Sequence, residues 1–104
     1  MKRPEIINRI REVMRNIAPD AQTILYGSEA RGEAREDSDI DLLVLLSESR
    51  LTPERELEIV SQLYKIELET GVIISPMIMS RKTWEDRPFH TPFSLNVMKE
   101  GVTL

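Results

Sequence analysis

The sequence predicts an α/β (α+β) fold in which a mixed β-sheet has helices packed on one face. Apolar residues recur at helical spacing over residues 4–17, and two short apolar runs follow at 23–26 and 40–46. The complete predicted order is helix, strand, strand, helix, strand, helix, helix, which suits a sheet covered by helices. Because 104 residues can build one modest core and no second one, we expect a single domain over residues 1–104.

The first helix and two strands follow from the spacing of apolar residues. Six of these residues lie three or four apart and predict an amphipathic helix: Ile6, Ile7, Ile10, Val13, Met14 and Ile17. The segment Ala18-Pro19-Asp20 ends this helix. We expect the strands at 23–26 and 40–46 to be central in the sheet.

Helix-capping residues divide the second half of the chain. Thr52 before Pro53 predicts a helix that ends at Gly71. Its apolar positions are Leu57, Val60, Leu63, Tyr64 and Leu68. A third strand at 72–79 contains Pro76, which lacks an N–H, so it should lie at a sheet edge or form a bulge.

The last elements are shorter. Ser80 is expected to cap a helical turn through Trp84, and Thr91 before Pro92 starts a helix that Gly101 closes, ahead of a tail at 102–104. We expect the aromatic residues Trp84, Phe89 and Phe93 in the core rather than stacked on a base. The acidic residues of the 53–70 helix should form a solvated face, with partner docking as the alternative: Glu54, Glu56, Glu58 and Glu67.

Composition and charge exclude several functions. The chain has no cysteine, so disulfides and thiolate metal ligation are ruled out, and its single histidine, His90, has no recognisable catalytic partner. No apolar run approaches the ~20 residues of a membrane span, so we expect a cytoplasmic protein with no membrane partner. Residues 36–104 hold seven basic and thirteen acidic residues, and the chain has no broad basic stripe for duplex nucleic acid.

Two carboxylates at the start of the 40–46 run carry the main chemical signal. Asp39 and Asp41 are two residues apart, so in a strand they share one face. They repel each other unless a cation lies between them, and hard oxygen ligands suit Mg²⁺, whose coordination shell substrate phosphates can complete. The alternative is a solvated strand start, which is disfavoured because Asp41 lies inside the apolar run. We therefore predict a Mg²⁺ site at this pair.

The residues ahead of the pair fit phosphate binding. Gly27 lets backbone approach a ligand, and Ser28 offers a hydroxyl and an N–H at a predicted helix start, where it could equally be the N-cap. Arg31 is either a solvated arginine or a forked donor to a phosphate or an acid. Gly32 should supply a special backbone angle. Ser38 either caps the entry to the strand or contacts a metal-bound phosphate.

Taken together, Gly27-Ser28, Arg31-Gly32 and Ser38-Asp39-Ile40-Asp41-Leu42 resemble the signature of the DNA polymerase beta-like nucleotidyltransferase superfamily. The resemblance is to its minimal nucleotidyltransferases, small bacterial and archaeal proteins, and is strong over residues 27–44. It implies a nucleotidyltransferase-like fold, with the two aspartates as catalytic ligands of one or two Mg²⁺ ions. It also implies nucleotide binding by Gly27, Ser28, Arg31 and Ser38.

The activity that the resemblance implies is transfer of a nucleoside monophosphate from a Mg-NTP, with ATP the expected nucleotide, to an acceptor hydroxyl. The chain is also similar to the MNT-type antitoxins of HEPN/MNT toxin-antitoxin pairs. Their helical partner is a HEPN-class ribonuclease toxin, and a tyrosine of that toxin is the acceptor. The alternative is therefore a nucleotide-binding antitoxin, weakly active or inactive, that works by binding the toxin. A homo-oligomer is compatible with the sequence.

The sequence departs from the superfamily at one point. The family's enzymes carry a third carboxylate on a later strand beside the pair, whereas residues 71–84 contain no Asp or Glu. Ser75 lies where that acid is expected, or a neighbour does if Pro76 bulges the strand. Glu69 is the first candidate for an acid supplied from elsewhere. Binding of a nucleotide is therefore better supported than its turnover.

Overall fold

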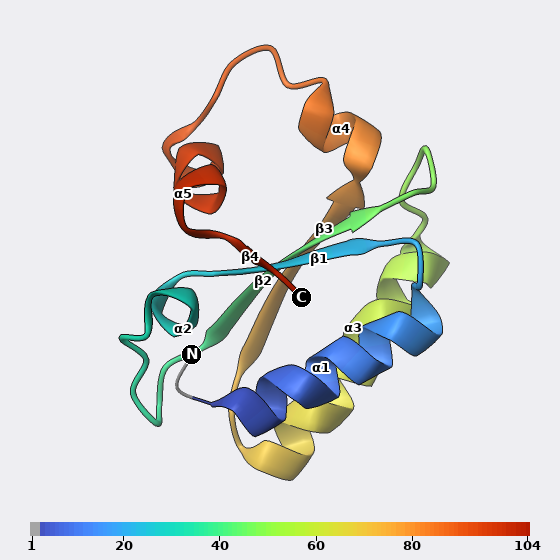
Figure 1. Cartoon of the computed structure of the whole chain (residues 1–104). Coiled ribbons are helices and arrows are strands. Elements are labelled where there is room, and N and C mark those ends of the chain that lie inside the picture. The colour runs from blue at the N-terminus through green and yellow to red at the C-terminus, as the bar shows by residue number, and fades with distance from the viewer. Residues whose placement is uncertain (1–2) are drawn as a thin grey trace.

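The computed structural model describes residues 3–104. Its helices are α1 (Pro4–Ile17), α2 (Ser28–Arg31), α3 (Pro53–Thr70), α4 (Arg81–Glu85) and α5 (Pro92–Glu100). Its strands are β1 (Gln22–Tyr26), β2 (Ile40–Leu46), β3 (Ile74–Ser80) and β4 (Val102–Thr103). Figure 1 shows the strands crossing the middle of the molecule, with α1 and α3 on one side and α4 and α5 on the other.

The four strands form one mixed sheet in the order β3-β2-β1-β4. Strand β1 is antiparallel to β2 and β4, whereas β2 and β3 are parallel. The prediction that the first two strands are central is confirmed. The third strand lies at the edge, as Pro76 predicts, and its pairing with β2 is continuous from Ile74 to Ser80, so the proline sits there without a bulge.

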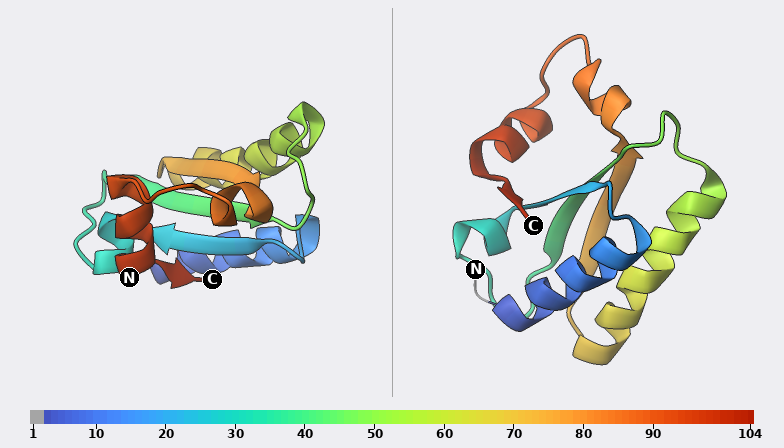
Figure 2. Two further views of the ribbon diagram at one scale, coloured as in Figure 1. Left: turned by 90° about the horizontal axis from the view of Figure 1, so that it is seen from above. Right: turned by 45° about the vertical axis from the view of Figure 1, so that its right-hand side comes forward.

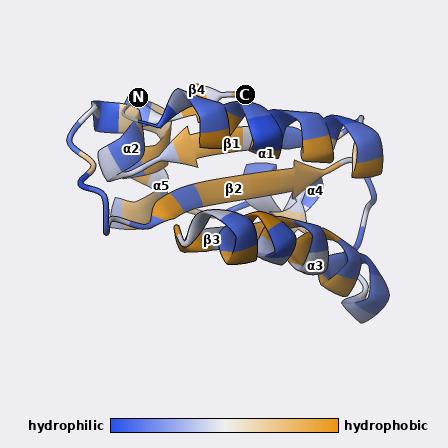
Figure 3. Cartoon of the chain, turned by 90° about the horizontal axis from the view of Figure 1, so that it is seen from below, coloured by the Kyte–Doolittle hydropathy of each residue, from blue (hydrophilic) through white to orange (hydrophobic). Residues whose placement is uncertain are grey.

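Strand β2 is the centre of the core because both of its faces are covered. Ile40, Leu42, Val44 and Leu46 pack with α1 and α3, and Leu43 and Leu45 pack on the opposite face with Val97 of α5. A near-continuous apolar run is what a strand buried on both faces requires, and β2 is almost wholly apolar in Figure 3. The predicted mixed sheet with helices on one face is confirmed by α1 and α3, and the short α4 and α5 add partial cover over the other face (Figure 2).

The predicted helix ends are also confirmed. Helix α1 spans Pro4–Ile17. Helix α3 begins after Thr52, and the Thr52 hydroxyl accepts a hydrogen bond from the Arg55 N–H. Helix α5 begins with a capping box between Thr91 and Ser94. Among the described residues, none of the helices combines the length and the apolar character that crossing a membrane requires.

Three expectations are corrected. The C-terminal tail is strand β4, because Val102 and Thr103 pair with β1 and complete the sheet edge. Trp84 and Phe93 pack on the sheet, but Phe89 is exposed. Of the apolar positions that mark α3, only Leu63 is buried. The core side of that helix is instead Ile59, Leu63 and Ile66.

Candidate functional site

The two aspartates lie at the beginning of β2, on the face that α5 partly covers. Asp41 has the same strand parity as Leu43 and Leu45, which pack against Val97 of α5. Asp39 directly precedes the strand and is exposed, whereas Asp41 is half-buried. The alternation predicted from the sequence therefore places both carboxylates on one sheet face, at the end where β2 begins.

Ser75 of β3 completes the neighbourhood of the pair. It is in register with Asp41 across the parallel β2–β3 ladder, and its hydroxyl donates to Oδ2 of Asp39 at 3.3 Å. Strand β3 therefore presents a neutral hydroxyl beside the aspartates. Glu69, the acid predicted as a substitute, is ion-paired with Arg9 between α3 and α1 and lies outside this neighbourhood.

Gly27 is the point where the backbone comes closest to the pair. Its φ of 78° lies in the region that favours glycine, and a β-carbon built there would overlap Oδ2 of Asp41. Gly27 is also the N-cap residue of α2, so Ser28 is the first helical residue rather than the cap. Gly32, with φ 74°, ends α2 in the left-handed conformation, as predicted.

A third carboxylate, which the sequence pattern did not predict, reaches this site from the end of α5. Oε1 of Glu100 accepts from the Gly27 N–H at 3.2 Å, and Nη1 of Arg31 donates to both of its oxygens, at 3.2 and 3.0 Å. Arg31 also pairs with Glu33. Of the roles predicted for Arg31, the forked donor to an acid is therefore the one that this structure contains.

The charges around Asp41 are poorly balanced. Burial raises the pKa of Asp41 above its ordinary value, the negative charges of Asp39 and Glu100 raise it further, and Arg31 opposes them. Tyr26, which is opposite Asp41 on β1, has a pKa raised by its own burial and by the Asp41 charge. The site therefore has an excess of negative charge that a cation would relieve.

The residues present fit a hard cation that substrate oxygens help to hold. No group of three or more His, Cys, Asp or Glu side chains in residues 3–104 is arranged to enclose a metal. Mg²⁺ in nucleotide sites usually has only one or two protein carboxylates and takes its other ligands from phosphates and water. Asp39 and Asp41 could supply those two carboxylates.

Comparison with known proteins assigns the family. The model of the nucleotidyltransferase domain family matches residues 7–100, from within α1 to the end of α5. The chain belongs to this family. A protein of Methanocaldococcus jannaschii named "Putative protein adenylyltransferase" is 33% identical over 79 residues, which are 74% of this nucleotidyltransferase-family chain and 79% of the relative.

Solved structures agree with the assignment. A "putative minimal nucleotidyltransferase" superposes with a TM-score of 0.63 at 29% identity, covering 100% of this chain and 97% of that one. A toxin-antitoxin with AMP-PNP gives a TM-score of 0.64 at 22% identity, over 92% of this chain and 69% of that one. The second comparison supports the fold alone.

Other predicted or conspicuous groups have local structural roles. Ser38 accepts a hydrogen bond from the Arg35 N–H at 2.9 Å, which is the capping role of its two predicted roles. Glu29 of α2 is fully buried and ion-paired with Arg3. Its carboxylate also accepts a hydrogen bond from the backbone N–H of Arg3. This pair ties the start of α1 to α2. His90 is exposed.

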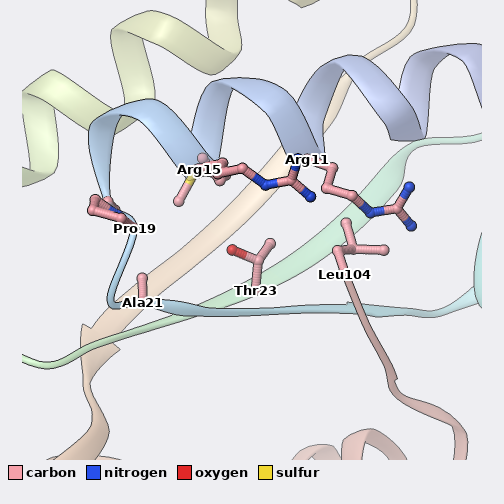
Figure 4. Close-up of a pocket in the computed structure, with 8 residues that line it drawn as sticks. Arg11, Arg15, Pro19, Ala21, Thr23 and Leu104 are labelled. Atoms are coloured by element: carbon pink, nitrogen blue, oxygen red, sulfur yellow. The ribbon is translucent and has the colours of Figure 1, made fainter.

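One hollow in the described part of the chain lies away from the aspartate pair. A cavity of about 110 Å³ lies between α1 and β1 and is lined by Arg11, Arg15, Thr23 and Leu104 among others (Figure 4). None of its lining residues belongs to the predicted site. The aspartate pair lies at the end of the sheet where β2 begins, with Asp39 exposed, and there charge and hydrogen bonds would hold a ligand.

Proposed function

We propose that the chain transfers a nucleoside monophosphate from a Mg-NTP to an acceptor hydroxyl. One observation supports this most directly: in a chain of the nucleotidyltransferase family, Asp39 and Asp41 lie together at the start of β2, and Asp41 lies against the glycine turn at Gly27. In the reaction the acceptor oxygen bonds to the α-phosphorus, and the bond from that phosphorus to its bridging oxygen breaks. Pyrophosphate leaves with the electron pair, and the proton of the acceptor hydroxyl passes to water.

Mg²⁺, when held by Asp39 and Asp41, would neutralise phosphate oxygens and favour an in-line arrangement of the attacking and leaving oxygens. The chain itself supplies the remaining functions. The Gly27 N–H and the Arg31 guanidinium now donate to Glu100. Once Glu100 releases these two donors, they would bind phosphate oxygens. The hydroxyls of Ser28 and Ser38 would donate further hydrogen bonds to the nucleotide.

We propose a protein hydroxyl as the acceptor and ATP as the nucleotide. The relative named as a protein adenylyltransferase supports both choices. The exposure of Asp39 at the end of the sheet is compatible with them, because an exposed site can meet a hydroxyl on the surface of another macromolecule.

The direct test is incubation of the chain with ATP labelled at the α-phosphate and with Mg²⁺, alone and with a candidate acceptor protein. Label should become covalently attached to the acceptor, and CTP, GTP and UTP should be poorer donors. The Asp39→Asn/Asp41→Asn variant is the control and should transfer nothing. If the wild-type chain transfers label to none of the acceptors offered, including the candidate acceptor protein, the proposed activity is contradicted.

A second candidate function has its own supporting observation, an exposed apolar stripe on α3. Leu57, Val60, Tyr64 and Leu68 lie three or four residues apart on the side of the helix away from the core. The side chains of Leu57 and Leu68 are 68% and 66% exposed. Helix α3 is therefore apolar on two opposite sides, and large exposed apolar patches mark interaction surfaces.

The charges beside the stripe indicate what kind of partner it fits. Helix α3 contains five glutamates and two basic residues, and one of those, Arg55, is already paired with Glu48 and Glu58. A second copy of this chain would oppose glutamates to glutamates. We therefore propose that the stripe, Leu57, Val60, Tyr64 and Leu68, binds a helical partner of the HEPN toxin class through an apolar face edged by Lys or Arg. The similarity of the fold to toxin-antitoxin structures supports this choice.

A further inference from the structure

The carboxylate of Glu100 is held by the two groups that the proposed function assigns to substrate phosphate. Its Oε1 accepts from the Gly27 N–H at 3.2 Å, and Arg31 donates to both oxygens. Its side chain is 20% exposed, so most of it is enclosed by this arrangement. A carboxylate and a phosphate use oxygen acceptors of the same kind toward backbone N–H and guanidinium donors.

Occupation of these donors by Glu100 has an electrostatic consequence. Three acidic side chains, Asp39, Asp41 and Glu100, lie near one another at the proposed site, and Arg31 is already shared between Glu100 and Glu33. An incoming triphosphate therefore meets acids rather than free donors. It can bind only if it displaces one of these acids or brings a cation.

The backbone next to Glu100 is closely packed and hydrogen-bonded. Gly101 directly follows it, and a β-carbon built there would lie 2.7 Å from Cγ2 of Ile24 and 2.5 Å from the carbonyl oxygen of Val97. The Gly101 N–H donates to that same carbonyl at 2.8 Å, and the next two residues pair with β1 as strand β4. We therefore expect release of the carboxylate by rotation of the Glu100 side chain rather than by movement of α5.

We propose that Glu100 is an internal competitor for the nucleotide phosphates: its carboxylate occupies the phosphate donors until the nucleotide displaces it. This inference rests on the proposed nucleotide site. A site whose binding-competent form is only a fraction of the population binds with an affinity reduced by that fraction. Glu100 thus lowers the affinity for every phosphate ligand, and most for ligands that arrive without a metal.

The test compares three variants by calorimetry, using inorganic pyrophosphate with and without Mg²⁺. Glu100→Gln removes the charge, and Glu100→Ala also removes the acceptor, because a glutamine oxygen can still accept from the Gly27 N–H. Glu33→Gln is the matched control, since Glu33 pairs with Arg31 as Glu100 does but makes no hydrogen bond to Gly27. Thermal unfolding of each variant verifies that it is folded.

We expect pyrophosphate to bind Glu100→Ala about tenfold more tightly than wild type, the effect of freeing one charge-assisted hydrogen bond. Glu100→Gln should give a smaller gain in the same direction, and Glu33→Gln should stay within about twofold of wild type. The Gly27 amide resonance should shift in both Glu100 variants before any ligand is added.

Two other outcomes are informative in different ways. If the wild-type chain binds pyrophosphate and the Glu100 variants bind it equally or more weakly, Glu100 is not a competitor, and weaker binding confined to the Mg²⁺ samples would make it a metal ligand instead. If no variant binds pyrophosphate under either condition, the proposed nucleotide site and this inference are both overturned.

Discussion

Gly27 lies directly against the carboxylate of Asp41, so closely that a β-carbon at position 27 would overlap Oδ2 of the aspartate. The contact joins the turn after β1 to the strand that carries the acids. Position 27 therefore favours glycine for two separate reasons, its positive φ and its close approach to Asp41.

Replacing Gly27 with alanine should destabilise the protein by about 2 kcal/mol, since it adds both backbone strain and a clash. Gly32→Ala is the matched control because Gly32 also has a positive φ, but a β-carbon at position 32 would meet nothing within 4 Å. This control should cost about 1 kcal/mol. Urea unfolding measures the loss of unfolding free energy in both variants. Equal losses in the two variants would show that the contact with Asp41 does not constrain position 27.

Asp41→Asn should stabilise the unliganded protein at neutral pH. Burial raises the pKa of Asp41, with the charges of Asp39 and Glu100 adding to the effect, so the folded state binds the proton more tightly than the unfolded state does. The free energy of unfolding therefore falls as pH rises from the unfolded pKa to the folded pKa, and the ionised carboxylate continues to cost stability above that window.

The advantage of Asp41→Asn should accordingly shrink as the pH falls through the folded pKa, and it should be constant below about 4, where Asp41 is protonated in both states. Denaturant unfolding at several pH values measures this. Asp37→Asn, at an exposed turn, is the control and should show no such trend. A wild-type protein more stable than Asp41→Asn at neutral pH would mean that the aspartate is not a source of unfavourable charge.

Ser75→Asp should increase nucleotide transfer in the presence of Mg²⁺, by at least about tenfold if a base is missing from the site. The register with Asp41 and the hydrogen bond to Asp39 place the new carboxylate beside the pair. Met77→Asp is the control because it lies on the same face of β3 two residues further along. An equal rate in Ser75→Asp and wild type would show that no carboxylate is needed at that position.

The exposed stripe on α3 should be dispensable for folding but required for partner binding. Leu57→Ser with Leu68→Ser should weaken binding of a HEPN-class helical partner more than tenfold and leave the melting temperature nearly unchanged, because both side chains are largely exposed. Leu95→Ser with Met98→Ser, which alters exposed apolar residues on α5, is the control. Co-purification and calorimetry with the partner decide the matter, and undiminished binding by the α3 variant would exclude this surface.

The sequence alone predicts most of the fold because local signals determine it. Caps at Thr52, Ser80 and Thr91 mark three helix starts, and the Asp-Ile-Asp spacing places both aspartates on one face. Strand β4 could not be foreseen, since a two-residue strand has no periodicity and exists only because β1 offers it an unpaired edge.

Two features of the site and surface depend on tertiary packing. Glu100 is 59 residues from Asp41 in the sequence, and only the placement of α5 over the sheet brings it to Gly27. In α3 two apolar patterns coexist, and the buried one, Ile59, Leu63 and Ile66, is no stronger than the exposed one. A single amphipathic helix pattern cannot tell which side meets the core, although the glutamates beside the exposed stripe were a signal that could have indicated it.

The central claim is that Asp39 and Asp41 form a Mg²⁺-dependent nucleotide site. Calorimetry with an ATP analogue whose α–β bridge cannot be cleaved tests it most directly, on the wild-type chain, on Asp39→Asn/Asp41→Asn, and on Asp37→Asn as the control. The account predicts binding that requires Mg²⁺, is lost in the double variant and is retained in the control. Binding of the analogue by the double variant with unchanged Mg²⁺ dependence would contradict it.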